Sequence, residues 1–268
     1  MGAFDGYYLY CDLDGTLFDD EKRVSPENRA AILSFIEEGG RFGVATGRVP
    51  SIIGAIESSL PVNAPCILAN GAGLYDLVEK TFLAVHPVDP VRTERVTSRA
   101  VELLPDTCPQ IFNTLGIYEL NPNQRDDPQT VIERMQTIHT SIERVPQPFL
   151  KFLLAHESNR LNALQAALFQ EGLFEGFSVF RSSDAYLEFV AEGVNKGAAL
   201  ADVRARCGDV RKILAIGDYN NDLEIVALAD IGGAPANAID EVRAVADIVL
   251  SADNNNSCVA RFLEAALG

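Results

Sequence analysis

Short apolar runs alternate with amphipathic stretches along the N-terminal part of the chain. Residues 7–13 form an apolar, aromatic-rich run that predicts a buried strand. Ser25-Pro26 then predicts the start of a helix that ends near Gly39-Gly40. The further elements predicted here are strands over 41–46 and 66–69, a helix over 50–59 and a hairpin over 71–79. This alternation of strands and helices predicts a parallel sheet.

The same rhythm returns after residue 190. The predicted elements are a helix from about Asn195, a strand over 213–216, a helix after Asn220, and a final strand and helix from Asp247 onward. Because both ends of the chain show one pattern, we expect them to form one α/β domain.

The middle of the chain, residues 83–185, differs in composition and pattern. It holds most of the prolines, and residues 149–155 and 177–180 are short segments that indicate strands. Two helices, over 90–104 and 158–169, would cover one face of a small antiparallel sheet. The expected domains are therefore a discontinuous core of residues 1–82 and 186–268 and an inserted α+β domain of residues 83–185.

Composition and charge exclude several classes of protein. Of the 268 residues, 47% are apolar, which is enough for a sizeable core. The formal net charge of −16 repels nucleic-acid backbones and anionic membranes. No apolar stretch approaches the roughly 20 residues that span a bilayer, and no export signal is recognisable. We expect a cytoplasmic protein with no nucleic-acid or membrane partner. The sequence favours neither a monomer nor a homodimer.

The first candidate chemistry follows the first predicted strand, in Asp12-Leu13-Asp14-Gly15-Thr16. Ligands in open α/β sheets bind beyond the carboxyl ends of the strands. A carboxylate there can attack phosphorus and form an acyl phosphate, so Asp12 is the candidate nucleophile. Asp14 could protonate the leaving oxygen and then deprotonate water. The alternative is a simple strand-to-turn junction, since Asp-Gly is a common turn signal and Thr16 can act as a cap.

Two further candidates are anion-binding groups. Thr46-Gly47-Arg48 follows the second predicted strand and offers a hydroxyl, backbone N–H groups and a cation to a phosphoryl oxygen. Its alternative role is a helix cap at Thr46. Lys196 lies at the start of a predicted helix, where the helix dipole disfavours positive charge, so an anionic partner such as Asp12 or a phosphoryl group is indicated. A solvated surface lysine is the alternative.

An acidic and amide-rich cluster follows the strand over 213–216. Its residues are Gly217-Asp218-Tyr219-Asn220-Asn221-Asp222. Oxygen ligands suit Mg²⁺, which keeps several waters and takes one or two protein carboxylates. Asp12, Asp218 and a backbone carbonyl near Asp14 are the expected metal ligands, with Asp222 acting through water. A helix N-cap at Asn220 or Asn221 is the alternative, and both can hold at once.

Taken together, these motifs resemble those of the haloacid dehalogenase superfamily of phosphohydrolases. The superfamily's Asp-x-Asp-x-Thr motif is met by Asp12, Asp14 and Thr16, its Thr or Ser by Thr46, its Lys by Lys196, and its Gly-Asp-x-x-Asn-Asp motif by Gly217, Asp218, Asn221 and Asp222. The large insertion, Thr46-Gly47-Arg48 and Asn70-Gly71-Ala72 look like the Cof-type subfamily with a C2B cap.

The resemblance implies a doubly wound, Rossmann-like parallel-sheet core and a mobile cap that selects the substrate. It implies Asp12 and Asp14 as catalytic residues, and Mg²⁺ at Asp12, Asp14, Asp218 and Asp222. It also implies phosphate binding by Thr46, Gly47, Arg48, Lys196 and Asn221, and a weaker substrate contact at Asn70. The expected protein is a magnesium-dependent phosphatase acting on a small phosphate monoester, with sugar phosphates the first choice.

Three other functions share parts of this pattern. A phosphomutase of the same superfamily would use the same phosphoaspartate, and the sequence barely separates it from a phosphatase. A phospho-accepting signalling domain would be shorter and would lack an acid at the position of Asp14. A dehalogenase would attack carbon and would need neither that acid nor magnesium.

Overall fold

The computed structural model describes residues 2–53, 56, 60–125, 127 and 135–268. Within that part of the chain, no helix is both long and apolar enough to cross a lipid bilayer.

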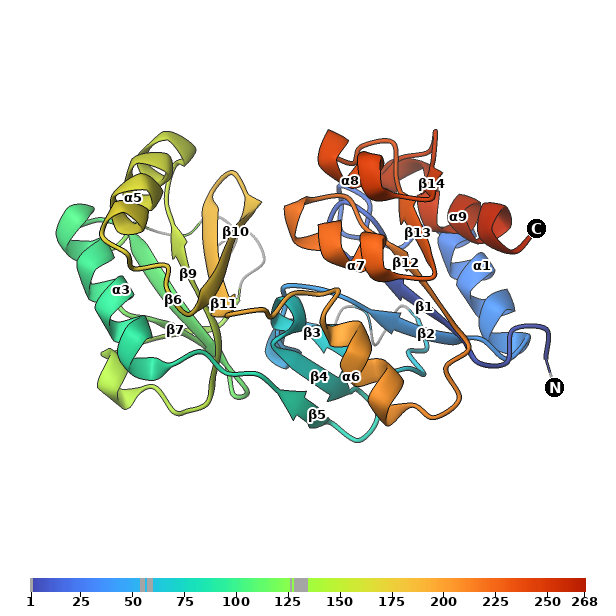
Figure 1. Cartoon of the computed structure of the whole chain (residues 1–268), viewed down its shortest axis with the longest axis horizontal. Coiled ribbons are helices and arrows are strands. Elements are labelled where there is room, and N and C mark those ends of the chain that lie inside the picture. Colours follow the sequence, from blue (N-terminus) through green and yellow to red (C-terminus); the bar gives the residue numbers. More distant parts are fainter. Residues whose placement is uncertain (1, 54–55, 57–59, 126, 128–134) are drawn as a thin grey trace. The chain divides into compact units, whose positions relative to one another are not determined.

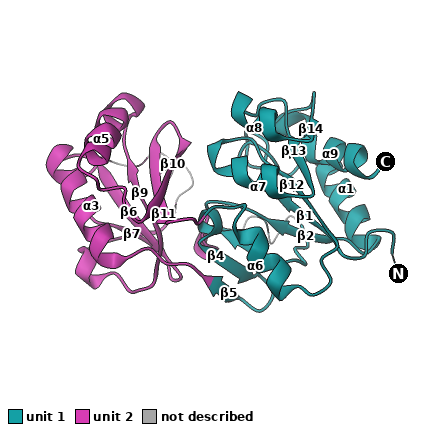
Figure 2. Ribbon diagram, in the orientation of Figure 1, with its two compact units in different colours: residues 1–47, 53–84, 195–268 teal, residues 48–52, 85–194 magenta. Residues whose placement is uncertain are grey.

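The chain divides into two compact units, which Figure 2 colours separately. Unit 1 comprises residues 1–47, 53–84 and 195–268, and unit 2 comprises 48–52 and 85–194. The division differs from the expected boundaries at β11 (Tyr186–Ala191), which the sequence assigned to the core. This strand belongs to unit 2 because it pairs antiparallel with β9 (Phe149–Ala155) and β10 (Phe177–Ser183).

The main sheet of unit 1 is parallel throughout. Its strand order is β14-β13-β12-β1-β2. The strands are β1 (Tyr7–Cys11), β2 (Arg41–Val44), β12 (Lys212–Ile216), β13 (Ile231–Ala234) and β14 (Ile248–Val249). The chain runs from β1 outward to β2 and later returns on the other side of β1, so the order reverses between β1 and β12. In such sheets the crevice at the carboxyl ends of the strands beside this reversal is the usual ligand site.

Helices cover both faces of this sheet, as predicted (Figure 1). Because side chains alternate along a strand, Leu9 and Cys11 of β1 enter one apolar cluster while Tyr8 and Tyr10 enter the other. The first cluster includes residues of α1 (Pro26–Glu37) and α9 (Cys258–Leu267), and the second includes residues of α6 (Ala199–Arg206), α7 (Leu223–Leu228) and α8 (Asp240–Val245). The predicted doubly wound α/β core is therefore confirmed.

Local signals explain where α1 begins. The Ser25 hydroxyl accepts a hydrogen bond from the Asn28 N–H, and Pro26 occupies the first turn, where its missing N–H costs nothing.

Other predicted elements differ from the structure. The helix expected from Asn195 begins only at Ala199, and neither β13 nor α8 was predicted as a separate element. Of the helix expected over 50–59, the structure describes a 3₁₀ turn, η1 (Pro50–Ile52), and most of the remainder lies outside the described residues.

A three-stranded sheet extends unit 1 beyond β2. It is formed by β3 (Cys66–Leu68), β4 (Gly73–Asp76) and β5 (Thr81–Val85). The predicted hairpin over 71–79 thus covers β4 and the turn that leads to β5. A single parallel bridge between Ala45 and Ile67 joins β2 to β3.

Unit 2 is a six-stranded sheet in the order β10-β11-β9-β6-β7-β8. Its remaining elements are β6 (Cys108–Asn113), β7 (Ile117–Glu119), β8 (Thr137–His139), η3 (Ile142–Arg144), α3 (Pro90–Leu103) and α5 (Ser158–Gln170). All pairs are antiparallel except β7 with β8. Residues of both helices pack on Phe152 and Phe189, whose rings stack with centroids 4.4 Å apart. The predicted small α+β arrangement is present.

Candidate active site

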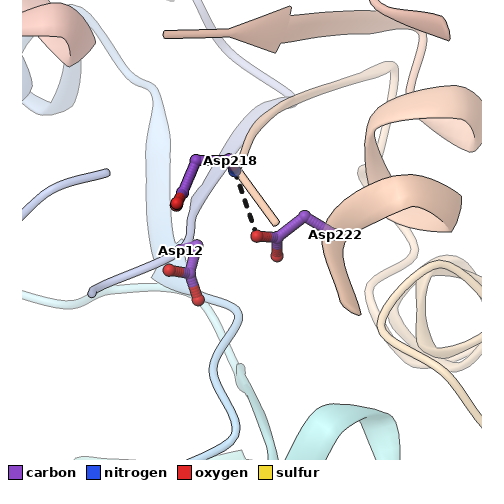
Figure 3. A group of neighbouring side chains, drawn as sticks. All are labelled: Asp12, Asp218 and Asp222. Atoms are coloured by element: carbon purple, nitrogen blue, oxygen red, sulfur yellow. Dashed lines mark hydrogen bonds between the residues drawn. The ribbon is translucent and has the colours of Figure 1, made fainter. Parts of the chain in front are cut away.

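Three buried carboxylates gather at the carboxyl ends of β1 and β12 (Figure 3). Asp12 directly follows β1, and Asp218 and Asp222 follow β12. One carboxylate oxygen from each lies within 4.8 Å of the others. Asp12, Asp218 and Asp222 are 7%, 9% and 1% exposed. Since β1 and β12 pair in parallel, their ends necessarily meet at one edge, where the sequence predicted a site.

Lys196 is fully buried within this cluster. Its Nζ donates to Asp12 Oδ1 and to Asp222 Oδ1, each at 2.6 Å. It lies in the turn before α6 and not inside a helix, so the argument from the helix dipole was wrong in its premise. The expected anionic partner is nevertheless present in Asp12, and the surface-lysine alternative is excluded by the burial.

Asp222 also holds the turn that carries Asp218. Its Oδ2 accepts the backbone N–H groups of Asp218, at 3.1 Å, and of Tyr219, at 3.2 Å. Both of its oxygens are therefore engaged with the protein. This arrangement suits a residue that orients the loop between β12 and α7, and its expected water-mediated metal contact stays a prediction.

Thr16 connects the loop after β1 to the same turn. Its hydroxyl donates to Asp218 Oδ1 at 2.6 Å. Gly15, with a φ of 88°, lies so close that a Cβ there would be 2.5 Å from Asp218 Oδ2. Only glycine permits this backbone and this approach. Thr16 thus orients a candidate metal ligand. This role differs from the cap that the sequence offered as its alternative.

A second group of polar residues lies at the ends of β2 and β3. Thr46 is buried after β2, and its carbonyl accepts the N–H of Asn70 at 3.0 Å. The side chain of Asn70 accepts in turn from Asn221 Nδ2 at 3.0 Å. Ala69 and Asn70 both have left-handed backbones, with φ of 50° and 57°. Such strain costs roughly 1–3 kcal/mol per residue and clusters at functional sites. The predicted positions Thr46, Asn70 and Asn221 are therefore linked.

Two predicted residues, Asp14 and Arg48, lie outside these two groups, whereas Gly47 borders the second. Asp14 is partly exposed, and its Oδ1 accepts from Lys22 Nζ at 2.6 Å. Gly47 is next to Asn70, since a Cβ on it would lie 3.1 Å from Asn70 Nδ2. Arg48 belongs to the short segment grouped with unit 2, where its Nη1 donates to the Ile52 carbonyl at 3.4 Å. The phosphate contact expected of Arg48 stays a prediction.

The buried cluster contains three carboxyl groups and one amine, and their pKa values are shifted. Burial raises the pKa of Asp12 well above its usual range; Lys196 opposes this rise and the Asp222 charge adds to it. Burial, together with Asp222, raises the pKa of Asp218 to about 7 although the Thr16 hydrogen bond works against it. For Lys196, burial alone would lower the pKa, but Asp12 and Asp222 outweigh it and raise the pKa. Lys196 is therefore a permanent cation here.

The charges of these side chains indicate whether the cluster suits a metal ion. When all three carboxylates are ionised, the single ammonium leaves two of their negative charges uncompensated. A divalent cation would balance them, and carboxylate oxygens are the donors that Mg²⁺ prefers. Asp218 is buried, is oriented by Thr16 and forms no ion pair with another described residue, so the donor set fits a hard divalent ion.

Comparison with known proteins identifies the family. Residues 9–263 match the family model of the haloacid dehalogenase-like hydrolases. The chain belongs to this family. This membership confirms the predicted superfamily and the predicted Cof type.

Similar members of the family are phosphatases. The chain is 27% identical over 245 residues to 5-amino-6-(5-phospho-D-ribitylamino)uracil phosphatase YcsE of Bacillus subtilis, covering 89% of this chain and 87% of that one. It is 25% identical over 266 residues to pyridoxal phosphate phosphatase YbhA of Escherichia coli, covering 94% and 95%. The predicted enzyme class, a phosphoric monoester hydrolase, is confirmed for this haloacid dehalogenase-like hydrolase.

The fold is likewise shared. A haloacid dehalogenase-like hydrolase from Bacteroides thetaiotaomicron matches with a TM-score of 0.82 at 24% identity, covering 98% of this chain and all of that one.

Replacing Lys196 by Met should destabilise the metal-free protein strongly, because it leaves Asp12 and Asp222 buried without their cation. Breaking a buried ion pair in this way costs about 3–5 kcal/mol. Urea unfolding in chelator would measure the loss. Lys80→Met, at an exposed lysine of unit 1, is the matched control and should change stability by less than about 0.5 kcal/mol. Equal stability of the two variants would contradict the burial argument.

Replacing Asp218 by Asn should have the opposite effect on the metal-free protein. The folded-state pKa of Asp218 is raised to about 7, so between about pH 4 and 7 the folded state binds a proton that the unfolded state has lost. Stability from this group therefore falls as pH rises through that window. The Asn variant has no such loss. Its free energy of unfolding in chelator, relative to that of the natural protein, should therefore rise from about pH 4 to about pH 7. A constant difference across the window would refute the assignment.

Proposed function

We propose that this protein is a Mg²⁺-dependent phosphatase that hydrolyses a small phosphate monoester through an aspartyl phosphate on Asp12. The observation that carries the proposal is the buried Asp12 carboxylate at the end of β1, held by the Lys196 ammonium at 2.6 Å. A carboxylate placed there can reach an ester phosphorus at the edge of the sheet, and the cation can offset the charge that gathers around it.

The proposed reaction has two steps. In the first, an Asp12 oxygen forms a bond to phosphorus while the bond from phosphorus to the alkoxy oxygen breaks, and Asp14 gives its proton to that leaving oxygen. In the second, Asp14 takes a proton from water as the water oxygen bonds to phosphorus. The bond between phosphorus and Asp12 then breaks, which releases inorganic phosphate and restores the Asp12 carboxylate.

The remaining site residues would bind the phosphoryl group and the metal. Thr46, Gly47 and Asn221 offer a hydroxyl, a backbone N–H and an amide to phosphoryl oxygens, with Arg48 as a further cation. Mg²⁺ would be held by Asp12, Asp218 and a backbone carbonyl near Asp14, with Asp222 behind a water. When bound, it would offset the negative charge of the phosphoryl group.

Unit 2 would select the leaving group. On its sheet, Lys151, Glu188 and Phe112 alternate with the residues that face the helices, so they lie on the opposite face. Lys151 Nζ donates to Glu188 Oε2 at 2.6 Å and lies 4.5 Å from the centroid of the Phe112 ring. Ser182, on the edge strand β10, donates to the other oxygen of Glu188.

This row of side chains supports a polyhydroxylated leaving group. An ammonium has three N–H donors, and among the described residues Lys151 donates one hydrogen bond, to Glu188. Buried cations are normally satisfied more fully, so the remaining donors are suited to ligand oxygens. A sugar or polyol hydroxyl can accept from Lys151 and donate to Glu188. This complementarity favours the sugar phosphates among the small monoesters.

Replacing Asp12 by Asn should abolish turnover while preserving the hydrogen bond from Lys196, because an amide oxygen accepts but does not attack phosphorus. Phosphate release from a panel of monoesters, with magnesium and with chelator, would measure it. We expect at least about a thousandfold loss, as for other nucleophile removals. Full activity in the variant would exclude Asp12 as the nucleophile. No release by the natural protein from any ester would favour a phosphomutase.

Replacing Lys151 by Met should reduce kcat/KM for sugar phosphates by about 10- to 100-fold, which corresponds to the loss of one or more charged hydrogen bonds. Activity on phenyl phosphate, whose leaving group has no further hydroxyls, should change by less than about threefold. Thermal unfolding controls for loss of structure. Equal losses on both substrates would contradict a role of Lys151 in recognising hydroxyl groups.

A further inference from the structure

The ion pair between Lys22 and Asp14 is short but is not explained by stability. Lys22 Nζ lies 2.6 Å from Asp14 Oδ1, and the two side chains are 50% and 32% exposed. Exposed pairs of this kind contribute little to stability. Lys22 also has a left-handed backbone, with a φ of 61°, which is unfavourable for a residue with a side chain. Stability therefore does not explain why a left-handed lysine is paired with Asp14, and backbone strain beside a candidate catalytic residue is typical of functional positions.

The loop that carries Lys22 is tightly built. Asp19 Oδ1 accepts the N–H groups of Glu21 and Arg23, both at 2.9 Å. The N–H of Lys22 donates to the Asp19 carbonyl, and the N–H of Asp19 donates to the Arg23 carbonyl. These hydrogen bonds all lie within residues 19–23, and they close a reverse turn. Lys22 is thus presented to Asp14 by a formed turn.

The base of this loop is anchored by asparagines from the C-terminal part of unit 1. Asn254 Nδ2 donates to the Phe18 carbonyl at 3.1 Å and to Asp20 Oδ1 at 3.0 Å. Asn237 Nδ2 donates to the Gly15 carbonyl at 2.8 Å, and its Oδ1 accepts the N–H of Asn254. Both ends of the segment between Gly15 and Asp20 are therefore fixed.

We propose that Lys22 is a positioning residue for Asp14, orienting its carboxylate through Oδ1 so that proton exchange with the leaving oxygen is efficient. The proposal rests on the proposed function, in which Asp14 is the general acid and base. A general acid must lie within about 2.6–3.2 Å of the atom that it protonates, and a displacement of about 1 Å can cost a hundredfold in rate. A carboxylate that is one-third exposed needs such a restraint.

The test uses aryl phosphates of graded leaving-group pKa, from p-nitrophenyl to phenyl phosphate. A good leaving group departs without a proton, whereas a poor one needs the acid. Because kcat/KM covers steps up to the first transfer to Asp12, it isolates the acid role. For Lys22→Met we expect kcat/KM to fall about tenfold on phenyl phosphate and less than about threefold on p-nitrophenyl phosphate, which steepens the dependence on leaving-group pKa.

Three further variants make the result specific. Lys22→Arg keeps a cation and should restore most of the activity on phenyl phosphate. Lys80 is also an exposed lysine with a left-handed backbone, with a φ of 53°, so Lys80→Met is the matched control and should leave the slope unchanged. In an Asp14→Asn background, Lys22→Met should have no further effect, since Lys22 acts through Asp14.

The outcomes separate this proposal from the proposed function. Release by the natural protein that Asp12→Asn abolishes would support the phosphatase in the same assay. Given that release, equal losses on good and poor leaving groups, or an additive loss in the Asp14→Asn background, would overturn the role of Lys22. Absence of release by the natural protein on every ester would instead overturn the proposed function.

Discussion

The structure of the site depends on one buried cation between two buried carboxylates. Lys196 has no exposed surface, and it is tolerable there only because Asp12 and Asp222 lie 2.6 Å from its Nζ. The dependence is mutual, since either carboxylate would be costly in that position without it. The neighbouring arrangement follows from this contact. Asp222 must also hold the turn at Asp218, and the Lys196 turn must pass against Gly71, where a Cβ would be 2.2 Å from the Asn195 carbonyl.

The contact of Lys196 with Asp12 and Asp222 leaves part of the negative charge of the site uncompensated. Asp218 adds a third carboxylate that Lys196 does not directly neutralise, and its raised pKa expresses that excess. A protein selected for stability alone would place an apolar or amide side chain there. The excess negative charge, the left-handed backbone at Asn70 and the strained Lys22 all reduce stability, and all three lie in unit 1 at or beside predicted site residues. Features that oppose folding and gather at one place are best explained by binding and catalysis.

The sequence predicted that Asp12 and Asp218 would lie close together, for a physical reason. Asp12 and Asp218 each follow an apolar run that predicts a buried parallel strand, and the carboxyl ends of neighbouring parallel strands meet. The two helices of unit 2 were also predicted, because their apolar periodicity is local information. β13 was missed because two of its four residues are glycines, which carry no strand signal.

Partners distant in sequence were beyond such reasoning. Thr16 and Asp218 are 202 residues apart, and no local pattern in the sequence predicts their hydrogen bond. Lys22 stands in a run of charged residues that resembles any solvated loop, and only its left-handed backbone and its distance from Asp14 distinguish it. For Lys196 the inference of an anionic partner succeeded although the helix begins four residues later than expected.

The interruption of unit 1 by unit 2 has a consequence for the order of events during synthesis. Lys196 is the second residue after the chain returns to unit 1, and 184 residues separate it from Asp12. β1 leaves the ribosome early, yet one of its two neighbours, β12, is made only after all of unit 2. Until then the nascent chain lacks the ammonium that makes burial of Asp12 tolerable. Unit 2 can complete its own sheet first, whereas the edge that carries Asp12 and Lys196 forms last, when β12 pairs with β1.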